Sequence, residues 1–158
     1  MKAFDYSKLL TCRRVIIDGD PGAGKTTLAN QMANDLGFKV ISFDDSKYLP
    51  GDGRLYLEQL NYDVLKNDIL SCGSKIIIEG LFALKVLGKI CVSYDYHIFM
   101  KLFNGICGWE YEYYLGEKSK IPKSKLTKEV VQYYKDYRPF DVCNLVLSRE
   151  LTSQLKAG

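Results

Sequence analysis

The sequence predicts an α/β fold in which a five-stranded, mainly parallel sheet lies between two layers of helices. Short apolar segments rich in β-branched residues alternate with segments whose apolar residues recur every three or four positions. Such alternation favours a parallel sheet with helices on both faces. A glycine-rich stretch at residues 19–26 follows the first apolar segment directly. The chain of 158 residues suits one domain, 1–158, with a single core.

The first strand, expected over residues 13–18, leads into the sequence Gly-Asp-Pro-Gly-Ala-Gly-Lys-Thr. Residues 19–26 fit G-x-x-x-x-G-K-[ST], the P-loop or Walker A motif. Glycines allow the backbone to turn tightly and to bring its N–H groups close to phosphate oxygens. Leu28, Met32 and Leu36 then recur on a helix that Gly37 ends. Because strand, loop and helix follow in the required order, a chance glycine-rich turn is the weaker interpretation.

The motif predicts which residues hold a nucleotide in a P-loop NTPase fold. Lys25 supplies positive charge for the outer phosphates, and Thr26 offers a hydroxyl ligand to Mg²⁺. The start of the helix adds free N–H groups and the positive end of its dipole. The predicted nucleotide-binding residues are Gly19, Asp20, Pro21, Gly22, Ala23, Gly24, Lys25, Thr26 and Thr27.

The remaining elements follow from apolar periodicity and turn residues. Strands are expected over residues 13–18, 38–43, 75–80, 96–100 and 144–148. Helices are expected over residues 24–36, 57–72, 81–87, 101–114 and 126–137, with a short terminal helix after the last strand. The polar segments 48–53 and 116–125 are expected to be loops, and residues 1–12 a lead-in that includes at most a short helix.

Composition and charge exclude several classes of protein. The hydrophobic fraction is 47%, the charged fraction 26% and the net charge +3, ordinary values for a globular domain. The mild positive excess suits a ligand that carries phosphate and does not require nucleic acid. No apolar run approaches the roughly 18 residues of a membrane span, and the N-terminus lacks the apolar core of a signal peptide. The five scattered cysteines form no C-x-x-C pair, so we expect reduced thiols, no zinc site and a cytoplasmic protein.

Carboxylates follow the first three expected strands at one edge of the sheet. Right-handed crossovers bring the C-terminal ends of parallel strands together, and ligands bind at that edge. Asp18, the pair Asp44 and Asp45, and Glu79 should therefore meet over the P-loop. The two adjacent aspartates can reach an acceptor hydroxyl and Glu79 can hold Mg²⁺, as phosphoryl transfer requires. The alternatives are a strand-end turn for the aspartates and a helix cap for Glu79.

Two segments resemble the uridine kinase and phosphoribulokinase group of P-loop kinases. Residues 41–50, Ile-Ser-Phe-Asp-Asp-Ser-Lys-Tyr-Leu-Pro, are similar to the acceptor-site segment of that group, where a strand ends in an aspartate and a tyrosine follows. Residues 76–84, Ile-Ile-Ile-Glu-Gly-Leu-Phe-Ala-Leu, are similar to its strand that ends in Glu-Gly. Weaker similarities lie at residues 61–63 and 137–141.

The resemblance implies an ATP-dependent kinase that transfers the γ-phosphate to a hydroxyl of a small molecule such as a nucleoside. It implies Asp44 as the catalytic base, with Asp45 as the second candidate, and Lys25 and Thr26 on phosphates and metal. Glu79 would lie on the metal side, and the cofactors would be ATP and Mg²⁺. The implied substrate-binding residues are Asp44, Tyr48, Asp63 and Arg138.

The group carries arginines in a lid that clamps the transferring phosphate. Between residues 116 and 125 this chain has lysines instead, at 118, 120, 123 and 125. The clamp is then expected from a lid that includes Lys118–Lys125, from Arg138 or from Arg54, or is absent. A solvated loop is the alternative for the lysines. His97, in the middle of an expected strand, is interpreted as structural.

A nucleoside kinase is the favoured function, but other functions remain open. The chain could be another P-loop phosphotransferase, acting on a sugar, a small acid or a polynucleotide end, or a nucleotide-binding protein that has lost catalysis. A GTPase-like switch would need an N-K-x-D stretch, which the sequence lacks. We expect a small-molecule substrate and no membrane partner, with nucleic acid disfavoured. The sequence leaves the oligomeric state open.

Overall fold

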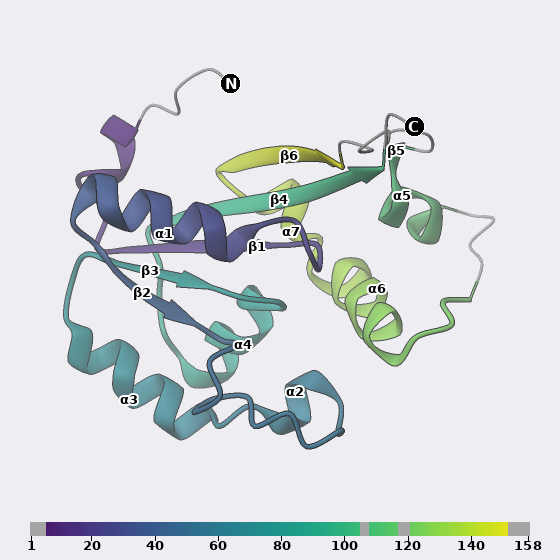
Figure 1. Cartoon of the computed structure of the whole chain (residues 1–158), viewed down its shortest axis with the longest axis horizontal. Coiled ribbons are helices and arrows are strands. Elements are labelled where there is room, and N and C mark those ends of the chain that lie inside the picture. Colours follow the sequence, from purple (N-terminus) through teal and green to yellow (C-terminus); the bar gives the residue numbers. More distant parts are fainter. Residues whose placement is uncertain (1–5, 105–107, 117–120, 152–158) are drawn as a thin grey trace, which may run out of the picture.

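The computed structural model describes residues 6–104, 108–116 and 121–151, which form the expected α/β fold (Figure 1). The elements, in chain order, are η1 Tyr6–Leu9, β1 Arg14–Gly19, α1 Lys25–Leu36, β2 Lys39–Ser42, α2 Tyr56–Gln59, α3 Tyr62–Cys72, β3 Ile76–Glu79, α4 Ala83–Ile90, β4 Tyr96–Asn104, β5 Gly108–Trp109, α5 Glu110–Leu115, α6 Lys125–Tyr137, α7 Pro139–Val142 and β6 Leu145–Leu151.

The sheet confirms the expectation of a mainly parallel arrangement. Within the described residues, β2, β3, β1, β4 and β6 are parallel neighbours in that order. The short strand β5 adds an antiparallel pairing at the end of β4. The P-loop leaves β1 in the middle of the sheet, so it has β3 and β2 on one side and β4 and β6 on the other (Figure 1).

Helices cover both faces of the sheet, which makes three layers. Side chains alternate along β1, so that Val15 and Ile17 pack in the cluster that contains Met32 of α1. Ile16 points to the opposite face and packs in the cluster that contains residues of α3, α4 and α6. Across the described residues no helix is both long and apolar enough to cross a membrane.

The expectation of a helix over residues 101–114 is wrong in its first part. Strand β4 continues to Asn104, and of the described residues in this range the helical ones belong to α5, Glu110–Leu115. The reason is a partner distant in sequence, because β6 pairs with β4 from Ile98 to Asn104. Pairing across a sheet overrides the local pattern of an aromatic-rich segment. The expected terminal helix after residue 148 is wrong for residues 149–151, which continue β6, and the rest of it lies outside the described residues.

The expected helix over residues 57–72 is two helices, α2 and α3. Asn61 begins α3 as its N-cap, and its side-chain oxygen accepts a hydrogen bond of 3.2 Å from the Val64 N–H. Asparagine is a preferred N-cap, so this boundary had a local signal that the periodicity obscured. Before the break, α2 contacts α6, because the Tyr56 N–H donates a hydrogen bond to Oε2 of Glu129.

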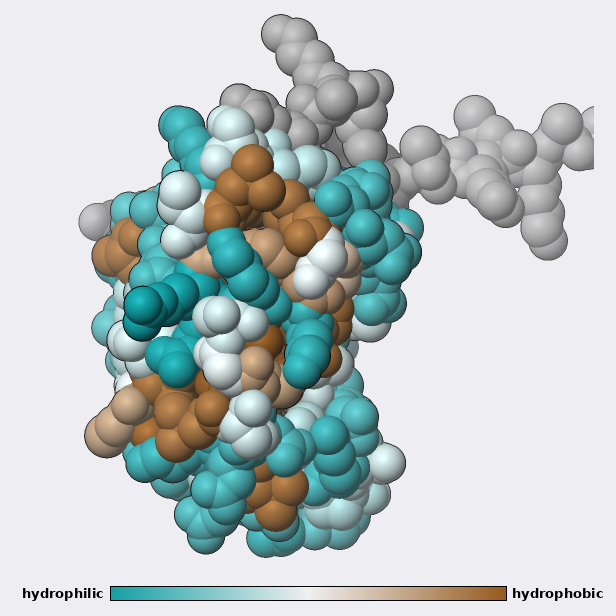
Figure 2. Space-filling view, turned by 90° about the vertical axis from the view of Figure 1, so that its left-hand side faces the viewer, coloured by the Kyte–Doolittle hydropathy of each residue, from teal (hydrophilic) through white to brown (hydrophobic). Residues whose placement is uncertain are grey.

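The N-terminal ends of the strands form the face that Figure 2 presents, opposite the P-loop. Apolar residues on this face lie in patches that polar residues separate (Figure 2). The Asp95 carboxylate accepts hydrogen bonds of 2.8 and 2.9 Å from the backbone N–H groups of Arg13 and Arg14. Asp95 therefore fixes the start of β1, which is a structural role.

Candidate active site

Lys25 occupies the centre of the candidate site, at the first residue of α1. Its side chain is 6% exposed, and its Nζ donates to two backbone carbonyls of the P-loop at 3.4 and 2.9 Å. Burial lowers the pKa of Lys25, whereas the carboxylates of Asp18, Glu79, Asp44 and Asp20 raise it. The structure thus gathers the strand-end carboxylates around the ammonium of the P-loop.

The close approach of the P-loop to β4 depends on a glycine. Gly19 has a φ of 140°, and a Cβ at this position would collide with the backbone of Met100. The next residue donates its N–H to the Met100 carbonyl at 2.9 Å. The loop therefore leaves β1 pressed against the neighbouring strand, which a larger residue at Gly19 would prevent.

Thr26 and Glu79 form the second part of the site. The Thr26 hydroxyl donates a hydrogen bond of 2.9 Å to Oε1 of Glu79. Glu79 is fully buried, and its Oε2 has no hydrogen-bond partner among the described residues. The helix-cap alternative is not realised, because α4 follows Phe82 without a side-chain cap. A buried carboxylate oxygen without a partner, beside a hydroxyl, is a fitting place for a hard cation.

A metal ion here would depend on ligands from outside the protein. The described residues contain no group of three or more histidine, cysteine, aspartate or glutamate side chains that could hold one. Mg²⁺ commonly keeps several waters and binds through one or two protein oxygens plus substrate phosphates. Thr26 and Glu79 fit that pattern and would share Mg²⁺ with the phosphates of a nucleotide.

Asp44 and Asp45 have different environments at the end of β2. Oδ1 of Asp44 accepts a hydrogen bond of 2.7 Å from the Tyr56 hydroxyl, and its carboxylate acts on the pKa of Lys25. Oδ1 of Asp45 instead accepts from the backbone N–H of Lys47 at 3.1 Å. The strand-end turn expected as an alternative therefore describes Asp45, and Asp44 is the aspartate beside the P-loop.

Tyr56 positions Asp44, although no motif in the sequence points to this tyrosine. Its backbone N–H donates to Oε2 of Glu129 on α6 at 3.2 Å, and its ring lies 5.3 Å from that of Phe82. Burial, followed by the nearby Asp44 carboxylate, raises the pKa of Tyr56, so its hydroxyl stays protonated and donates. One oxygen of Asp44 is thereby fixed, and the other is available to a substrate.

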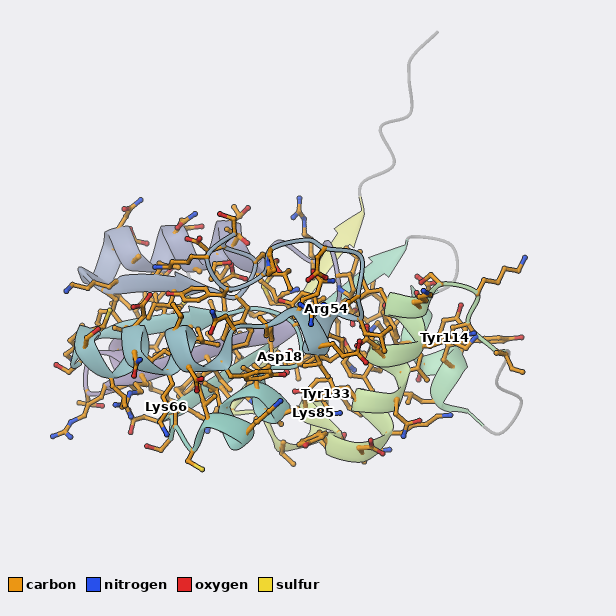
Figure 3. The ribbon with its side chains drawn as sticks, turned by 90° about the horizontal axis from the view of Figure 1, so that it is seen from below. Asp18, Arg54, Lys66, Lys85, Tyr114 and Tyr133 are labelled. Atoms are coloured by element: carbon orange, nitrogen blue, oxygen red, sulfur yellow. The ribbon has the colours of Figure 1, made fainter. Side chains whose placement is uncertain are left out.

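Helix α6 holds the two aspartates at the root of the P-loop through adjacent tyrosines. The Tyr133 hydroxyl donates to Oδ2 of Asp18, and Figure 3 shows these two residues side by side. The Tyr134 hydroxyl donates to Oδ1 of Asp20 at 2.6 Å. Burial raises the pKa of Asp18 to about 6, against the effect of the Tyr133 hydrogen bond. These contacts join residues more than a hundred positions apart, so no local pattern predicts them.

Both carboxylate oxygens of Asp20 accept hydrogen bonds from other residues of the protein. Its Oδ2 accepts from the backbone N–H of Leu102 and from Nε1 of Trp109, both at 2.7 Å, in addition to the Tyr134 contact. The side chain is fully buried, and burial raises its pKa. Asp20 thus fastens the P-loop to β4, β5 and α6, and its carboxylate does not face a ligand. Tyr111 packs against Trp109 in this cluster.

His97 is buried in the middle of β4, as expected for a structural residue. Its Nε2 lies 3.9 Å from Oδ2 of Asp18. Burial lowers the pKa of His97 to about 4, so the ring is neutral near pH 7. A neutral ring next to the carboxylate adds no charge to the site.

Other residues implied by the resemblance have partners elsewhere. Tyr48 is buried and donates its hydroxyl to Oδ2 of Asp68 at 2.6 Å, so this hydroxyl is not offered to a substrate. Asp63 is exposed in the first turn of α3, where a carboxylate favours the helix dipole. Arg138 ends α6 and pairs with Asp141 at 2.5 Å.

Among the described residues, the two arginines named as candidates for the phosphate clamp have carboxylate partners of their own. Arg54 pairs with Asp52 at 2.5 Å on the loop before α2. Lys118 and Lys120 lie outside the described residues, while Lys123 and Lys125 are exposed at the start of α6. Arg54 is therefore engaged locally, and the lid that includes Lys118–Lys125 stays a prediction.

Two sequence comparisons each match less than half of the chain. The model of the ATPase family associated with various cellular activities (AAA) matches residues 15–77. The replication factor C large subunit of Methanococcus aeolicus is 33% identical over 76 residues, which cover 48% of this chain and 14% of that protein. The chain thus spans a small part of the length of this curated relative.

Solved structures match almost the whole chain. A possible uridine kinase from Bacillus stearothermophilus has a TM-score of 0.52 at 18% identity, over 85% of this chain and 88% of that one. A shikimate kinase from Acinetobacter baumannii in complex with shikimate has a TM-score of 0.52 at 13% identity, over 90% and 86%. A gluconokinase from Sinorhizobium meliloti has 0.50 at 12%, over 89% and 83%. These similarities show the fold, which is that of P-loop kinases, and the uridine kinase group is one of several that match.

Proposed function

We propose that this protein is an ATP-dependent kinase that transfers the γ-phosphate to a hydroxyl of a small molecule, with a nucleoside as the expected acceptor. The observation that carries the proposal is the arrangement around Lys25. A phosphate-binding loop, a hydroxyl–carboxylate pair with a free oxygen, and a positioned aspartate meet at one sheet edge. Phosphoryl transfer needs these three parts.

Each part has a distinct role in the proposal. Lys25 and the N–H groups of the P-loop hold the outer phosphates and stabilise the charge that develops during transfer. Thr26 and Glu79 would hold Mg²⁺, which neutralises phosphate charge when it is bound. Asp44, fixed through Oδ1 by Tyr56, orients the acceptor hydroxyl with its other oxygen and takes its proton.

Support for a small-molecule acceptor comes from the solved structures, which are named as kinases for uridine, shikimate and gluconate. The segments 41–50 and 76–84 support a nucleoside among these acceptors. The free thiols of Cys12, Cys72, Cys91 and Cys143 support a reducing, cytoplasmic location.

A nucleotide-binding protein that has lost catalysis is the second candidate. The observation that favours it is the engagement of Arg54 and Arg138 in local ion pairs, away from the role of a phosphate clamp. Both candidates require the P-loop to bind ATP. They differ in whether an acceptor makes the bound ATP turn over.

An acceptor panel separates the candidates. ADP release would be followed with ATP and Mg²⁺ alone and with nucleosides, sugars or small hydroxy acids, and products would be identified by mass spectrometry. The proposal expects ADP release that requires one acceptor class and a phosphorylated product of that class. ADP release without an acceptor would identify an ATPase, and ATP binding without turnover would support the second candidate. Lys25→Ala is the control for contaminating activity.

A further inference from the structure

Strands β4 and β6 extend beyond the end of β1 and form a wall beside the P-loop. β1 ends at Gly19, which pairs with Met100, whereas β4 and β6 remain paired up to Asn104 and Leu151. Arg149 lies in this extension, opposite Leu102. Leu145 and Leu147 pack in the α1 cluster, so alternation along β6 places Arg149 on the same face as α1.

The guanidinium of Arg149 lies against the P-loop at the start of α1. A Cβ added to Gly24 would collide with Nη1 of Arg149 and would lie 3.6 Å from its Cδ. Gly24 is the N-cap of α1, in a left-handed conformation with a φ of 87°, and it provides no side-chain cap. Glycine adopts this backbone conformation easily and lets the guanidinium approach the loop without being displaced.

A cation at this position is unfavourable unless an anion joins it. The N-terminus of a helix carries partial positive charge, so it repels a guanidinium. Lys25, the first residue of the same helix, adds the positive charge of a buried ammonium. Arg54 and Arg138 each have a carboxylate partner, but among the described side chains none lies within ion-pair distance of Arg149. Arg149 is exposed, and an anion that the protein does not supply would complete this arrangement.

The order of the strands indicates which part of a nucleotide this anion is. Asp44 and Glu79 follow β2 and β3, on one side of β1, whereas Arg149 belongs to β6 on the other side. In-line transfer places the attacking and leaving oxygens on opposite sides of the γ-phosphorus. With the acceptor hydroxyl at Asp44, the leaving β-phosphate and the α-phosphate extend toward β4 and β6.

We propose that Arg149 binds the α- and β-phosphates of the nucleotide, an inference that rests on nucleotide binding by the proposed kinase. The planar guanidinium can donate two parallel hydrogen bonds to phosphate oxygens, which a lysine cannot do. Arg149 contacts the donor nucleotide and not the acceptor. It places a cationic group beside Gly24 from a strand, whereas Arg54 and Arg138 are paired with carboxylates.

Binding of ATP, ADP, AMP and inorganic pyrophosphate to Arg149→Gln and Arg149→Lys would test the proposal by calorimetry. Arg149→Gln should weaken ATP, ADP and pyrophosphate by a similar factor, about 10- to 100-fold for a charge-assisted contact. Arg149→Lys should recover part of the loss. Arg13→Gln, an exposed arginine at the opposite end of β1, is the matched control and should bind as the parent does.

The outcomes distinguish this proposal from the function on which it rests. Weakening of ATP alone would assign Arg149 to the γ-phosphate, and equal weakening of AMP would assign it to the nucleoside part; either result overturns the proposal. Parent-like binding by Arg149→Gln, with binding lost in Lys25→Ala, overturns it and leaves the kinase intact. No binding by the parent would overturn the proposed function itself.

The melting temperature without nucleotide distinguishes phosphate binding by Arg149 from a role in stabilising the fold. Removing a cation from the N-terminus of α1 should leave the melting temperature unchanged or raise it. A marked fall in the melting temperature of Arg149→Gln would mean that Arg149 stabilises β6, and would overturn the proposal.

Discussion

The carboxylates on the two sides of the P-loop differ in how many of their oxygens accept hydrogen bonds. On the β4 side, Asp20 accepts hydrogen bonds from Leu102, Trp109 and Tyr134, so both of its oxygens are occupied. On the β3 side, Glu79 has one oxygen on Thr26 and one without a partner among the described residues. Buried polar groups are nearly always paired, and an exception calls for a ligand or another explanation. Asp20, with both oxygens paired, stabilises the loop, and Glu79, with one unpaired oxygen, is available to bind a ligand.

The largest expected effect belongs to Lys25, which lies between the two sides. Lys25→Ala should weaken nucleotide binding and lower turnover by about 10³-fold, because preorganised charge at transferring phosphates is the main contribution of such sites. Calorimetry with ATP and ADP measures the first effect. Parent-like binding by this variant would contradict the assignment of the P-loop, provided that its circular dichroism spectrum is unchanged.

Glu79→Gln should weaken the binding of Mg²⁺ on the β3 side of the P-loop. The amide keeps an oxygen for the Thr26 hydroxyl but removes the charge that a hard cation prefers. We expect the Mg²⁺ concentration at half-maximal turnover to rise about 10- to 100-fold. An unchanged Mg²⁺ titration would place Glu79 with the structural carboxylates instead.

Asp18, below the P-loop, should produce a pH-dependent difference in stability. Burial raises its pKa from 3.8 to about 6, so the folded state holds this proton more tightly than the unfolded state does. The stability contributed by Asp18 is therefore fully present below about pH 4 and is lost as the pH rises through 6. Relative to the parent, Asp18→Asn should gain stability over this range, by up to about 3 kcal/mol.

Thermal unfolding of parent and variant at pH 4.5 and pH 7.5 measures this gain. His97 titrates in the opposite sense, because burial lowers its pKa to about 4, and its contribution is lost as the pH falls below 6.5. Because Nε2 of His97 lies 3.9 Å from Oδ2 of Asp18, the comparison of parent and variant is repeated in a His97→Asn background, which removes the His97 term. A difference that is the same at both pH values would contradict the buried, proton-holding role of Asp18.

Asp20→Asn is expected to have the smallest effect, and only on stability. The amide oxygen can still accept from Leu102 and Trp109, and the amide nitrogen can donate to the Tyr134 hydroxyl. Weaker hydrogen bonds and relief from burying a charge oppose each other, because burial raises the pKa of Asp20, so the free energy of unfolding should change by no more than about 1 kcal/mol. Urea unfolding measures this change, and the Mg²⁺ midpoint should not move. A shift as large as that of Glu79→Gln would remove the distinction between the two sides.

Local sequence predicted the parts of the site that lie next to strand ends. The P-loop, Asp44 and Glu79 each follow an apolar segment, and parallel topology alone brings such residues together. The contacts of Tyr56, Tyr133 and Tyr134 could not be predicted, because each joins a helix to a carboxylate on another element. A tyrosine on an apolar helix face has the same local pattern whether or not its hydroxyl finds a partner.

Arg149 and the length of β4 were missed for the same reason. The strand pairing of residues 101–104 and the position of the Arg149 guanidinium both depend on β6, which lies more than forty residues further along the chain. Periodicity describes which face a residue takes on its own element. It contains no information about which other element will extend beside it.

The kinetics of Asp44→Asn, with the acceptor identified in the panel, test the central claim most directly. The variant keeps the shape and one hydrogen-bond acceptor but loses the base, so kcat should fall about 10²- to 10⁴-fold with nearly unchanged ATP affinity. Tyr56→Phe, which only frees the carboxylate, should have a smaller effect, and Asp45→Asn, in the strand-end turn, a smaller effect than Asp44→Asn. If neither Asp44→Asn nor Asp45→Asn slowed phosphorylation of the acceptor, the assignment of an aspartate base at the end of β2 would be wrong.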